Sequence, residues 1–345
     1  MADASAAPRT RRGHLVGIAV AVGLVAAVFV FVLPRIADYR DVWEVLAGLS
    51  ARDAALLAAA TVLNVVTFAP PWMAALPGLG FRQALALTQA STALSIVSPA
   101  GAAVGMAGSY TLLRSWGFGR GSVGLAVAVT GVWNQFANLV FPIVALALLT
   151  AVNERHPALQ TAAFLGVVVL VVAVGAFALA LSSAGRARAL GSVVARILNL
   201  VRRLLRRPPV LWGGESLSSF RGRTLELLRR RWHVLTLATL VGHLSVFVVL
   251  LVCLRALGIA SGQVSVVEAF AGWALIRILG AMPVTPAGLG FVELGLSGAL
   301  VAFGASNADA VAATLLYRFL TVTPTLLLGL AAVVTWRKHD GREPV

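Results

Sequence analysis

A break rich in proline and glycine interrupts one of the long apolar stretches of this sequence. Residues 281–294 read AMPVTPAGLGFVEL and hold two prolines, two glycines and a carboxylate. A membrane interior offers backbone N–H and C=O groups no partner, so such a break persists there only where protein or a water-filled cavity covers it. A loop at the membrane surface is the alternative. The short apolar run at 290–303 favours a hairpin that dips into the membrane, because a full crossing needs roughly 20 residues.

A second break repeats the first at a constant offset of 187 residues. Residues 97–101 read VSPAG and residues 284–288 read VTPAG, and a glycine follows sixteen residues after each motif, at Gly117 and Gly304. Matched interruptions in two halves of a membrane chain are typical of transporters built from inverted repeats, whose binding site lies where the interrupted segments meet. The expected tip residues are Ser98, Pro99, Gly101, Thr285, Pro286, Gly288 and Gly290.

Composition agrees with a membrane location. Of the 345 residues, 59% are hydrophobic and 12% are charged, whereas a soluble domain has about 25% charged residues. We predict an all-α polytopic membrane protein with about six full spans and two re-entrant helical hairpins in an inverted-topology repeat. The spans are expected near residues 15–33, 54–68, 122–150, 159–181, 234–257 and 309–334. A signal peptide is the alternative for the first, but its apolar core would be shorter.

We expect one transmembrane domain at residues 14–335, with tails at 1–13 and 336–345. Of the 28 Lys and Arg residues, 21 fall on the side of the N-terminus, five on the other side and two inside apolar segments. The positive-inside rule then places both termini in the cytoplasm of a cell-membrane protein. The first hairpin would enter from the cytoplasm and the second from outside.

The segment 183–232 is predicted to be a basic cytoplasmic loop. Within it, residues 186–207 separate apolar and arginine faces at helical spacing, which indicates a helix on an anionic membrane surface; a helix packed on a partner or a solvated linker are the alternatives. The net charge of +15 does not indicate nucleic acid, because the interleaved aromatic residues of a stacking platform are missing.

Three charged residues are expected at membrane depth: Arg277, Glu293 and Arg318. Charges inside a bilayer are costly and commonly mark functional paths. We expect Glu293 to pair with one arginine while the other attracts an anion; an ion pair that only pins the second hairpin to the last span is the alternative. The candidate substrate-binding residues are Arg318, Arg277, Glu293, Tyr317, Thr285, Ser98, Asn134 and Asn138.

The two halves differ in these polar residues. The offset of 187 places Ala90, Met106 and Gly131 where the second half has the three charges. Asn134 and Asn138 lie one turn apart on one helix face, where they would line the cavity or hold helices together. Asn64 and His243 are expected to be helix-packing groups.

No enzyme signature is found. The sequence has no paired carboxylates in one segment, no Ser-His-Asp candidate set, no phosphate-binding glycine loop and no Cys/His metal spacing. We therefore expect neither catalytic activity nor a cofactor or metal.

The second break also carries a family resemblance. Residues 283–293 (PVTPAGLGFVE), followed by Gly304 and by 315–319 (LLYRF), resemble the transmembrane flippase domain of lysylphosphatidylglycerol synthases and its stand-alone relatives. That family has a Pro-Gly-Gly-Leu-Gly turn, a Glu three residues later and a Tyr-Arg in the last helix. The resemblance covers nearly the whole chain from the second span onward. Ala287 departs from the usual Gly, which is tolerable if this position needs no positive φ.

The resemblance implies a membrane domain that moves or handles lipids, with aminoacylated phosphatidylglycerol or polyprenyl-linked sugars as possible cargoes. Full-length synthases add a soluble aminoacyl-transferase domain, which we expect to be missing because the sequence ends soon after the last predicted span. The leading hypothesis is a transporter or flippase for anionic or aminoacylated phospholipids or lipid-linked headgroups. The alternatives are a membrane transferase on lipid-linked substrates and a non-transporting subunit that scaffolds a lipid or glycan biosynthetic enzyme.

Overall fold

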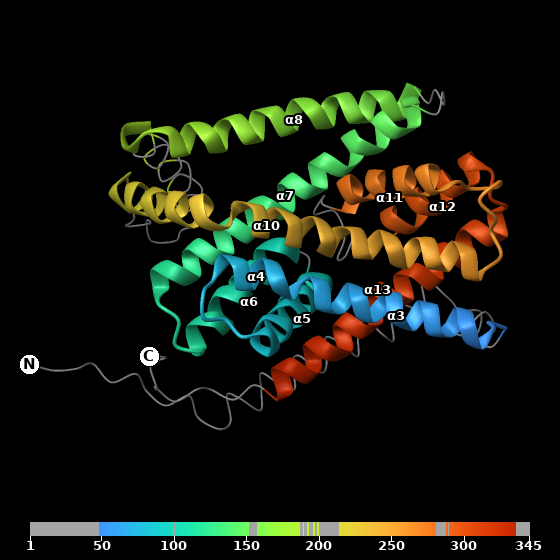
Figure 1. The fold of residues 1–345 in the computed structure, drawn as a ribbon, viewed down its shortest axis with the longest axis horizontal. Helices are drawn as coiled ribbons and strands as arrows, with labels where there is room; N and C mark the ends of the chain where they lie inside the picture. The colour runs from blue at the N-terminus through green and yellow to red at the C-terminus, as the bar shows by residue number, and fades with distance from the viewer. Residues whose placement is uncertain are drawn as a thin grey trace, which may run out of the picture.

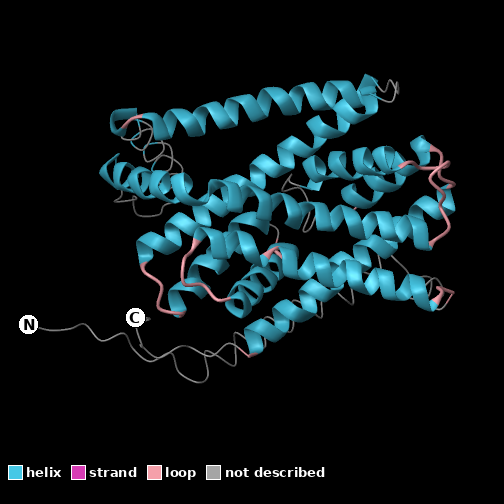
Figure 2. Cartoon of the chain, viewed as in Figure 1, coloured by secondary structure: helices cyan, strands magenta, loops and turns pink. Residues whose placement is uncertain are grey.

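All regular secondary structure in the described part of the chain is helical (Figure 2). The computed structural model describes residues 48–98, 101–151, 157–186, 189, 192, 196, 199, 214–280, 288 and 290–335. The helices are α3 (Ala51–Thr67), α4 (Ala69–Ala75), α5 (Phe81–Val97), α6 (Gly101–Ser115), α7 (Arg120–Ala151), α8 (Pro157–Ser182), α10 (Gly214–Ala256), α11 (Val266–Gly280), α12 (Phe291–Phe303) and α13 (Asn307–Val334).

Helix ends gather at two opposite ends of the bundle (Figure 1). The α4–α5 and α6–α7 connections lie at one end, and the α10–α11 and α12–α13 connections lie at the other. At 1.5 Å per residue, the 32 residues of α7 extend about 48 Å, whereas the 17 of α5 and 15 of α11 extend only about 25 and 22 Å. The pairs α5/α6 and α11/α12 therefore start from opposite ends and run only part-way along the bundle.

Serine and acidic residues start several of these helices. Ser50 precedes α3 and its Oγ accepts a hydrogen bond from the Asp53 N–H at 3.1 Å; Ser306 does the same for Asp309 in α13, also at 3.1 Å. Such N-caps satisfy backbone donors that the first helical turn leaves unpaired. The polar cap residues at 50 and 306 thus fix where α3 and α13 begin.

Two glycines at matched positions end the return helices of the pairs. Gly117 follows α6 with φ of 90°, and Gly304 follows α12 with φ of 119°. These left-handed values favour glycine, and at Gly304 they allow its N–H to reach the carbonyls of Leu300 and Val301. The glycine pair predicted from the 187-residue offset therefore has one conformational role in both halves.

The neighbours of each helix also follow the two halves. α5 packs on α6 and on α13, while α11 packs on α12 and on α7. Adding 187 to the residue numbers of α5 and α6 gives approximately α11 and α12, and subtracting 187 from those of α13 gives approximately α7. The contacts of α5 in the first half therefore correspond to the contacts of α11 in the second. α3 packs on α10, and the same shift carries one of these helices onto the other. One helix of each short pair thus packs on the long helix of the opposite half: α5 on α13 and α11 on α7.

Among the described residues, the two larger hydrophobic cores each surround one short pair, and a small third cluster lies between α5 and α13. The first includes the fully buried Trp273, Leu296 and Leu300 beside residues of α7, α10 and α13. The second includes Leu87 and Leu113 beside residues of α4, α7 and α10. α7 and α10 contribute to both cores and so join the halves.

Small residues bring α5 and α6 close together. A Cβ added at Gly105 would lie 2.0 Å from Ser95 Oγ and 2.8 Å from the Ser91 carbonyl oxygen, and one at Gly108 would lie 2.6 Å from Leu94 Cδ1. Close approach at small residues is a main source of helix association in membranes, where lipid is as apolar as the helix surface.

The structure supports a membrane-spanning bundle but not the full predicted count of spans. In the described residues, four helical segments are long and apolar enough to cross a membrane: Ala51–Ala75, Arg120–Ala151, Phe220–Ala256 and Asn307–Val334. α8 has 26 residues, and its fully described apolar part is Val167–Leu179. The predicted span at 15–33, both tails and most of the amphipathic segment at 186–207 lie outside the described residues.

The helix that contains the span predicted at 234–257 begins earlier, inside the segment predicted to be the basic loop. α10 begins at Gly214, about twenty residues before the span predicted at 234–257. The prediction followed the apolar run, but Phe220, Leu227 and Leu228 recur at helical spacing in the preceding basic segment and pack on the core around α5 and α6. The end of the span predicted at 54–68 agrees with the structure, since α3 ends at Thr67; the short helix α4 follows directly and holds Pro70 and Pro71 in its first turn.

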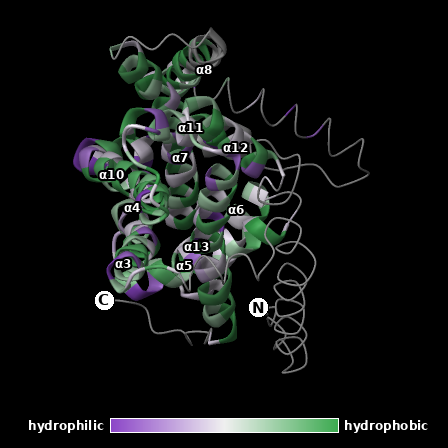
Figure 3. Cartoon of the chain, turned by 90° about the vertical axis from the view of Figure 1, so that its right-hand side faces the viewer, coloured by the Kyte–Doolittle hydropathy of each residue, from purple (hydrophilic) through white to green (hydrophobic). Residues whose placement is uncertain are grey.

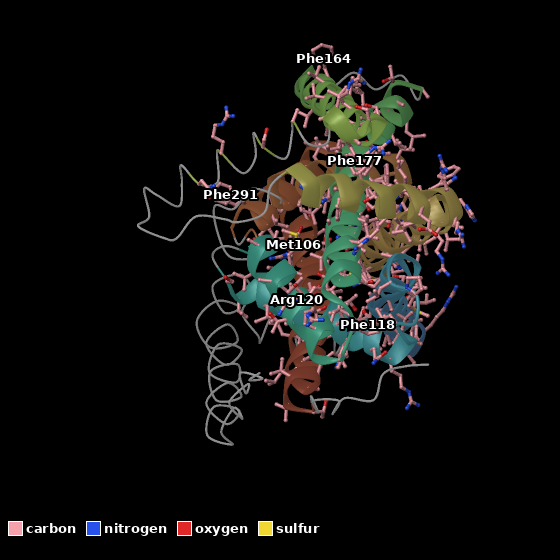
Figure 4. The ribbon with its side chains drawn as sticks, turned by 90° about the vertical axis from the view of Figure 1, so that its left-hand side faces the viewer. Met106, Phe118, Arg120, Phe164, Phe177 and Phe291 are labelled. Carbon is pink, nitrogen blue, oxygen red and sulfur yellow. The ribbon has the colours of Figure 1, made fainter. Side chains whose placement is uncertain are left out.

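Hydrophobic residues prevail along the helices (Figure 3), and many large apolar side chains are exposed. α8 shows this most clearly, since Phe164 is 67% exposed and lies at the outer edge of the molecule, whereas Phe177 lies nearer the bundle (Figure 4). Phe177 contacts Trp133 and Phe136 of α7 at ring-centroid distances of 6.0 and 5.8 Å. α8 is thus attached mainly through α7 and leaves a broad apolar face for lipid.

Candidate functional site

An ion pair links the start of α12 to the middle of α13. Arg318 Nε donates to Glu293 Oε1 at 2.6 Å, and both side chains are only 12% exposed. The other carboxylate oxygen, Oε2, accepts the Gly290 N–H at 2.7 Å. Glu293 therefore caps the first turn of α12 and holds Arg318 at the same time.

Arg318 lies well inside the bundle. It is eleven residues after the first residue of α13, a rise of about 16 Å, which is close to half the thickness of a bilayer core. An isolated charge at this depth is costly, and Glu293 supplies the compensating charge.

Arg277, near the end of α11, sits among neutral partners. Its Nε and Nη2 donate to Asn138 Oδ1 of α7 at 2.9 and 2.7 Å, and Nη2 also donates to His243 Nδ1 of α10 at 2.5 Å. The guanidinium carbon lies 5.0 Å from the ring centroid of Trp273, one helical turn earlier, in a cation–π arrangement. In the described part of the chain, no carboxylate lies within 4 Å of this guanidinium.

The geometry assigns the protonation of His243. A guanidinium can only donate, so Nδ1 of His243 must accept, and the ring proton lies on Nε2. From there it is donated to Asn134 Oδ1 at 2.9 Å. His243 is buried between the rings of Phe68 and Phe141, and it is neutral in this arrangement. Asn134, His243, Arg277 and Asn138 thus form one hydrogen-bonded chain across α7, α10 and α11.

Aromatic side chains form the apolar wall behind Arg277. Trp273, Phe141, Phe247 and Phe270 contact one another with centroid distances of 5.1–6.0 Å. Rings packed in this way are rigid and exclude water. They hold the Trp273 face against the guanidinium, so the position of the charge is fixed by packing as well as by hydrogen bonds.

The first half has an uncharged counterpart of the ion pair. Met106 and Gly131 occupy the positions that the 187-residue offset matches to Glu293 and Arg318, and a Cβ at Gly131 would lie 3.6 Å from Met106 Sδ. Met106 of α6 (Figure 4) thus lies near α7, as Glu293 of α12 contacts α13 through Arg318. The matched contact is preserved, but only the second half carries charge.

The comparison with known proteins identifies the family. A family model described as "Lysylphosphatidylglycerol synthase TM region" matches residues 15–329, nearly the whole chain. The chain belongs to this family. The resemblance inferred from the second break is confirmed, whereas a search of curated proteins finds no match.

In this lysylphosphatidylglycerol synthase TM-region domain, the structure gathers several of the predicted site residues. Tyr317 is 8% exposed and lies in electrostatic range of both Arg277 and Arg318. Ser98 ends α5, Gly101 begins α6, and Gly288 and Gly290 have φ of 67° and 83° before α12. No described contact joins Ser98 to the charged residues. Pro99, Thr285, Pro286 and the family departure at Ala287 lie outside the described residues.

Two members of the site were missed or underrated in the sequence. Trp273 was not singled out, although its spacing of four residues from Arg277 on one helix was a usable signal. His243 was expected to hold helices together, which it does, but its contact with Arg277 was not foreseen. Asn64 accepts a hydrogen bond from Ser245 at 3.4 Å and fits the helix-packing role.

Proposed function

We propose that this chain is a lipid transporter of the cell membrane that carries headgroups past a polar site inside the bundle. The observation that supports this most is the placement of Arg277, Glu293 and Arg318 within an apolar bundle. The first two lie on the short helices α11 and α12, and Arg318 lies in the middle of the long helix α13. A membrane-domain family that occurs with lipid-modifying synthases favours a lipid as the cargo.

The arrangement of the helices suggests how access would alternate. The pairs α5/α6 and α11/α12 would act as re-entrant hairpins of an inverted repeat, entering from the cytoplasm and from outside, with both termini in the cytoplasm. Because each pair packs on the long helix of the other half, rocking of the halves would expose the site to one side at a time. The chain would have no catalytic activity of its own.

The test is transbilayer movement in proteoliposomes. Fluorescent phosphatidylglycerol, its aminoacyl ester and phosphatidylcholine would be followed with wild type and with the Glu293→Gln/Arg318→Gln double variant. We expect wild type to accelerate movement at least about tenfold over empty vesicles, and the folded double variant to lose most of that gain. Arg230→Gln is the control, because Arg230 is an exposed residue in an ion pair with Glu226.

A scaffolding subunit is the second candidate, and the closed Glu293–Arg318 pair is the observation that favours it. A pair that is satisfied within the protein is what a purely structural pin would require. Lack of movement with every lipid, or movement unaffected by the double variant, would reject transport through this site. Co-purification of a lipid or glycan biosynthetic enzyme that survives the same double substitution would then support the scaffold.

A further inference from the structure

We infer that the site around Arg277 selects a headgroup with one net negative charge and rejects an aminoacylated, cationic one. This inference rests on the proposed function and narrows its substrate class. It starts from the difference between the two arginines, since Glu293 compensates Arg318 while the described partners of Arg277 are all neutral.

The described acidic residues are committed elsewhere. Asp53 and Asp309 lie in the first turns of α3 and α13, and Glu268 accepts the Ser265 N–H at 2.7 Å where α11 begins. Glu226 pairs with Arg230 in the basic first part of α10. The turn at residues 281–289 and the apolar run at 15–33 contain no ionisable side chain. Neither segment therefore brings a counter-charge to Arg277.

The charges of the site can then be added up. Among the residues that the structure describes, Glu293 and Arg318 cancel, His243 is neutral in its hydrogen-bonded form, and Arg277 leaves one positive charge inside an apolar bundle. A buried cation without a counter-charge is unfavourable, even when neutral groups accept its hydrogen bonds, and a bound anion of charge −1 removes that cost. A phosphodiester headgroup with an uncharged polar end has this charge, whereas a lysyl ester adds two ammonium groups and makes the headgroup cationic.

Uncharged polar groups next to Arg277 suit the rest of such a headgroup. Asn138, which accepts from Arg277, donates through Nδ2 to Gln135 Oε1 at 3.3 Å, and the Gln135 side chain is exposed. Amide groups donate to and accept from hydroxyls. The geometry therefore combines one cation for the phosphate with amides for a hydroxyl-bearing end.

Binding measured apart from transport tests the inference. The full chain in detergent would be titrated with a fluorescent short-chain phosphatidylglycerol, and unlabelled dihexanoyl phosphatidylglycerol, phosphatidylcholine and lysyl-phosphatidylglycerol would compete. We expect phosphatidylglycerol to compete at least about tenfold better than the lysyl ester, with phosphatidylcholine between them. Equal or better competition by the lysyl ester would overturn the inference.

Variants identify the residue responsible. Arg277→Gln should reduce the preference below about threefold, Arg277→Lys should retain most of it, and Arg230→Gln should leave it unchanged. Asn138→Asp places a carboxylate on the guanidinium, so it should raise thermal stability while abolishing the preference. A preference that persists in folded Asn138→Asp protein would overturn the inference.

The two proposals fail separately. Charge-selective binding without any lipid movement in proteoliposomes would reject transport and leave the selectivity standing. Lipid movement that does not depend on headgroup charge would support transport and reject the selectivity.

Discussion

At the scale of single residues, Glu293 and Arg318 stabilise each other because neither tolerates being buried alone. Removing one partner of a buried pair leaves an uncompensated charge, which costs about 3–5 kcal/mol, whereas removing both charges costs far less. We expect Glu293→Gln and Arg318→Gln each to lower the free energy of unfolding by an amount of this order. The double variant should lose less stability than the sum of the two single losses. Reversible unfolding in mixed detergent micelles measures all four proteins of this cycle.

Glutamine at position 293 keeps the start of α12, since its side-chain oxygen can still accept the Gly290 N–H. The single variant therefore reports the loss of charge rather than the loss of the cap. Additive losses in the double variant would show that the two side chains do not interact energetically.

At the scale of helices, the close contact of α5 and α6 depends on the absence of a side chain at Gly105. Alanine there would place its Cβ against Ser95 Oγ and the Ser91 carbonyl, so we expect Gly105→Ala to destabilise the protein by about 1–3 kcal/mol. Gly124 is the matched control, because it lies inside α7 and an added Cβ would meet no heavy atom within 4 Å. Gly124→Ala should be neutral or stabilise by up to about 1 kcal/mol. Thermal unfolding measures the stability of the two variants under the same conditions, and equal effects of the two substitutions would contradict the packing argument.

The sequence predicted which segments are helices better than where they begin. Long apolar runs and the Pro/Gly breaks located α5 to α7 and α11 to α13, because both signals are local. The sequence did not predict where α10 begins, since the first part of this helix is basic and packs on another part of the chain. Within the site, Arg277, Glu293 and Arg318 stood out by their charge. The sequence could not predict which arginine pairs with Glu293, because Arg318 lies 25 positions away from it. It also could not predict the contact between His243 and Arg277, which are 34 positions apart.

At the scale of the whole molecule, the exchange of contacts between halves is the feature that a transport mechanism would use. α13 supports α5, and α7 supports α11, so neither short pair is held by its own half alone. Because α7 carries Asn134 and Asn138 and α13 carries Arg318, the two long helices also deliver the polar groups. A relative movement of the halves would change the surroundings of Arg277 and of the ion pair together.

The orientation of the whole bundle can be tested by cysteine labelling, because Cys253 is the single native cysteine and is buried. In a Cys253→Ala background, the exposed positions Ser122, Ser261 and Ala308 would each be replaced by cysteine. Ser122 lies in the first turn of α7, Ser261 in the α10–α11 connection and Ala308 in the first turn of α13. The α6–α7 connection is at one end of the bundle, whereas the α10–α11 and α12–α13 connections are at the opposite end (Figure 1). The excess of Lys and Arg predicts that the Ser122 end faces the cytoplasm. A membrane-impermeant maleimide should therefore label the Ser261→Cys and Ala308→Cys variants in intact cells, and the Ser122→Cys variant only after permeabilisation. Labelling of all three from one side would mean that the short pairs do not enter from opposite sides, and the alternating-access proposal would fail with it.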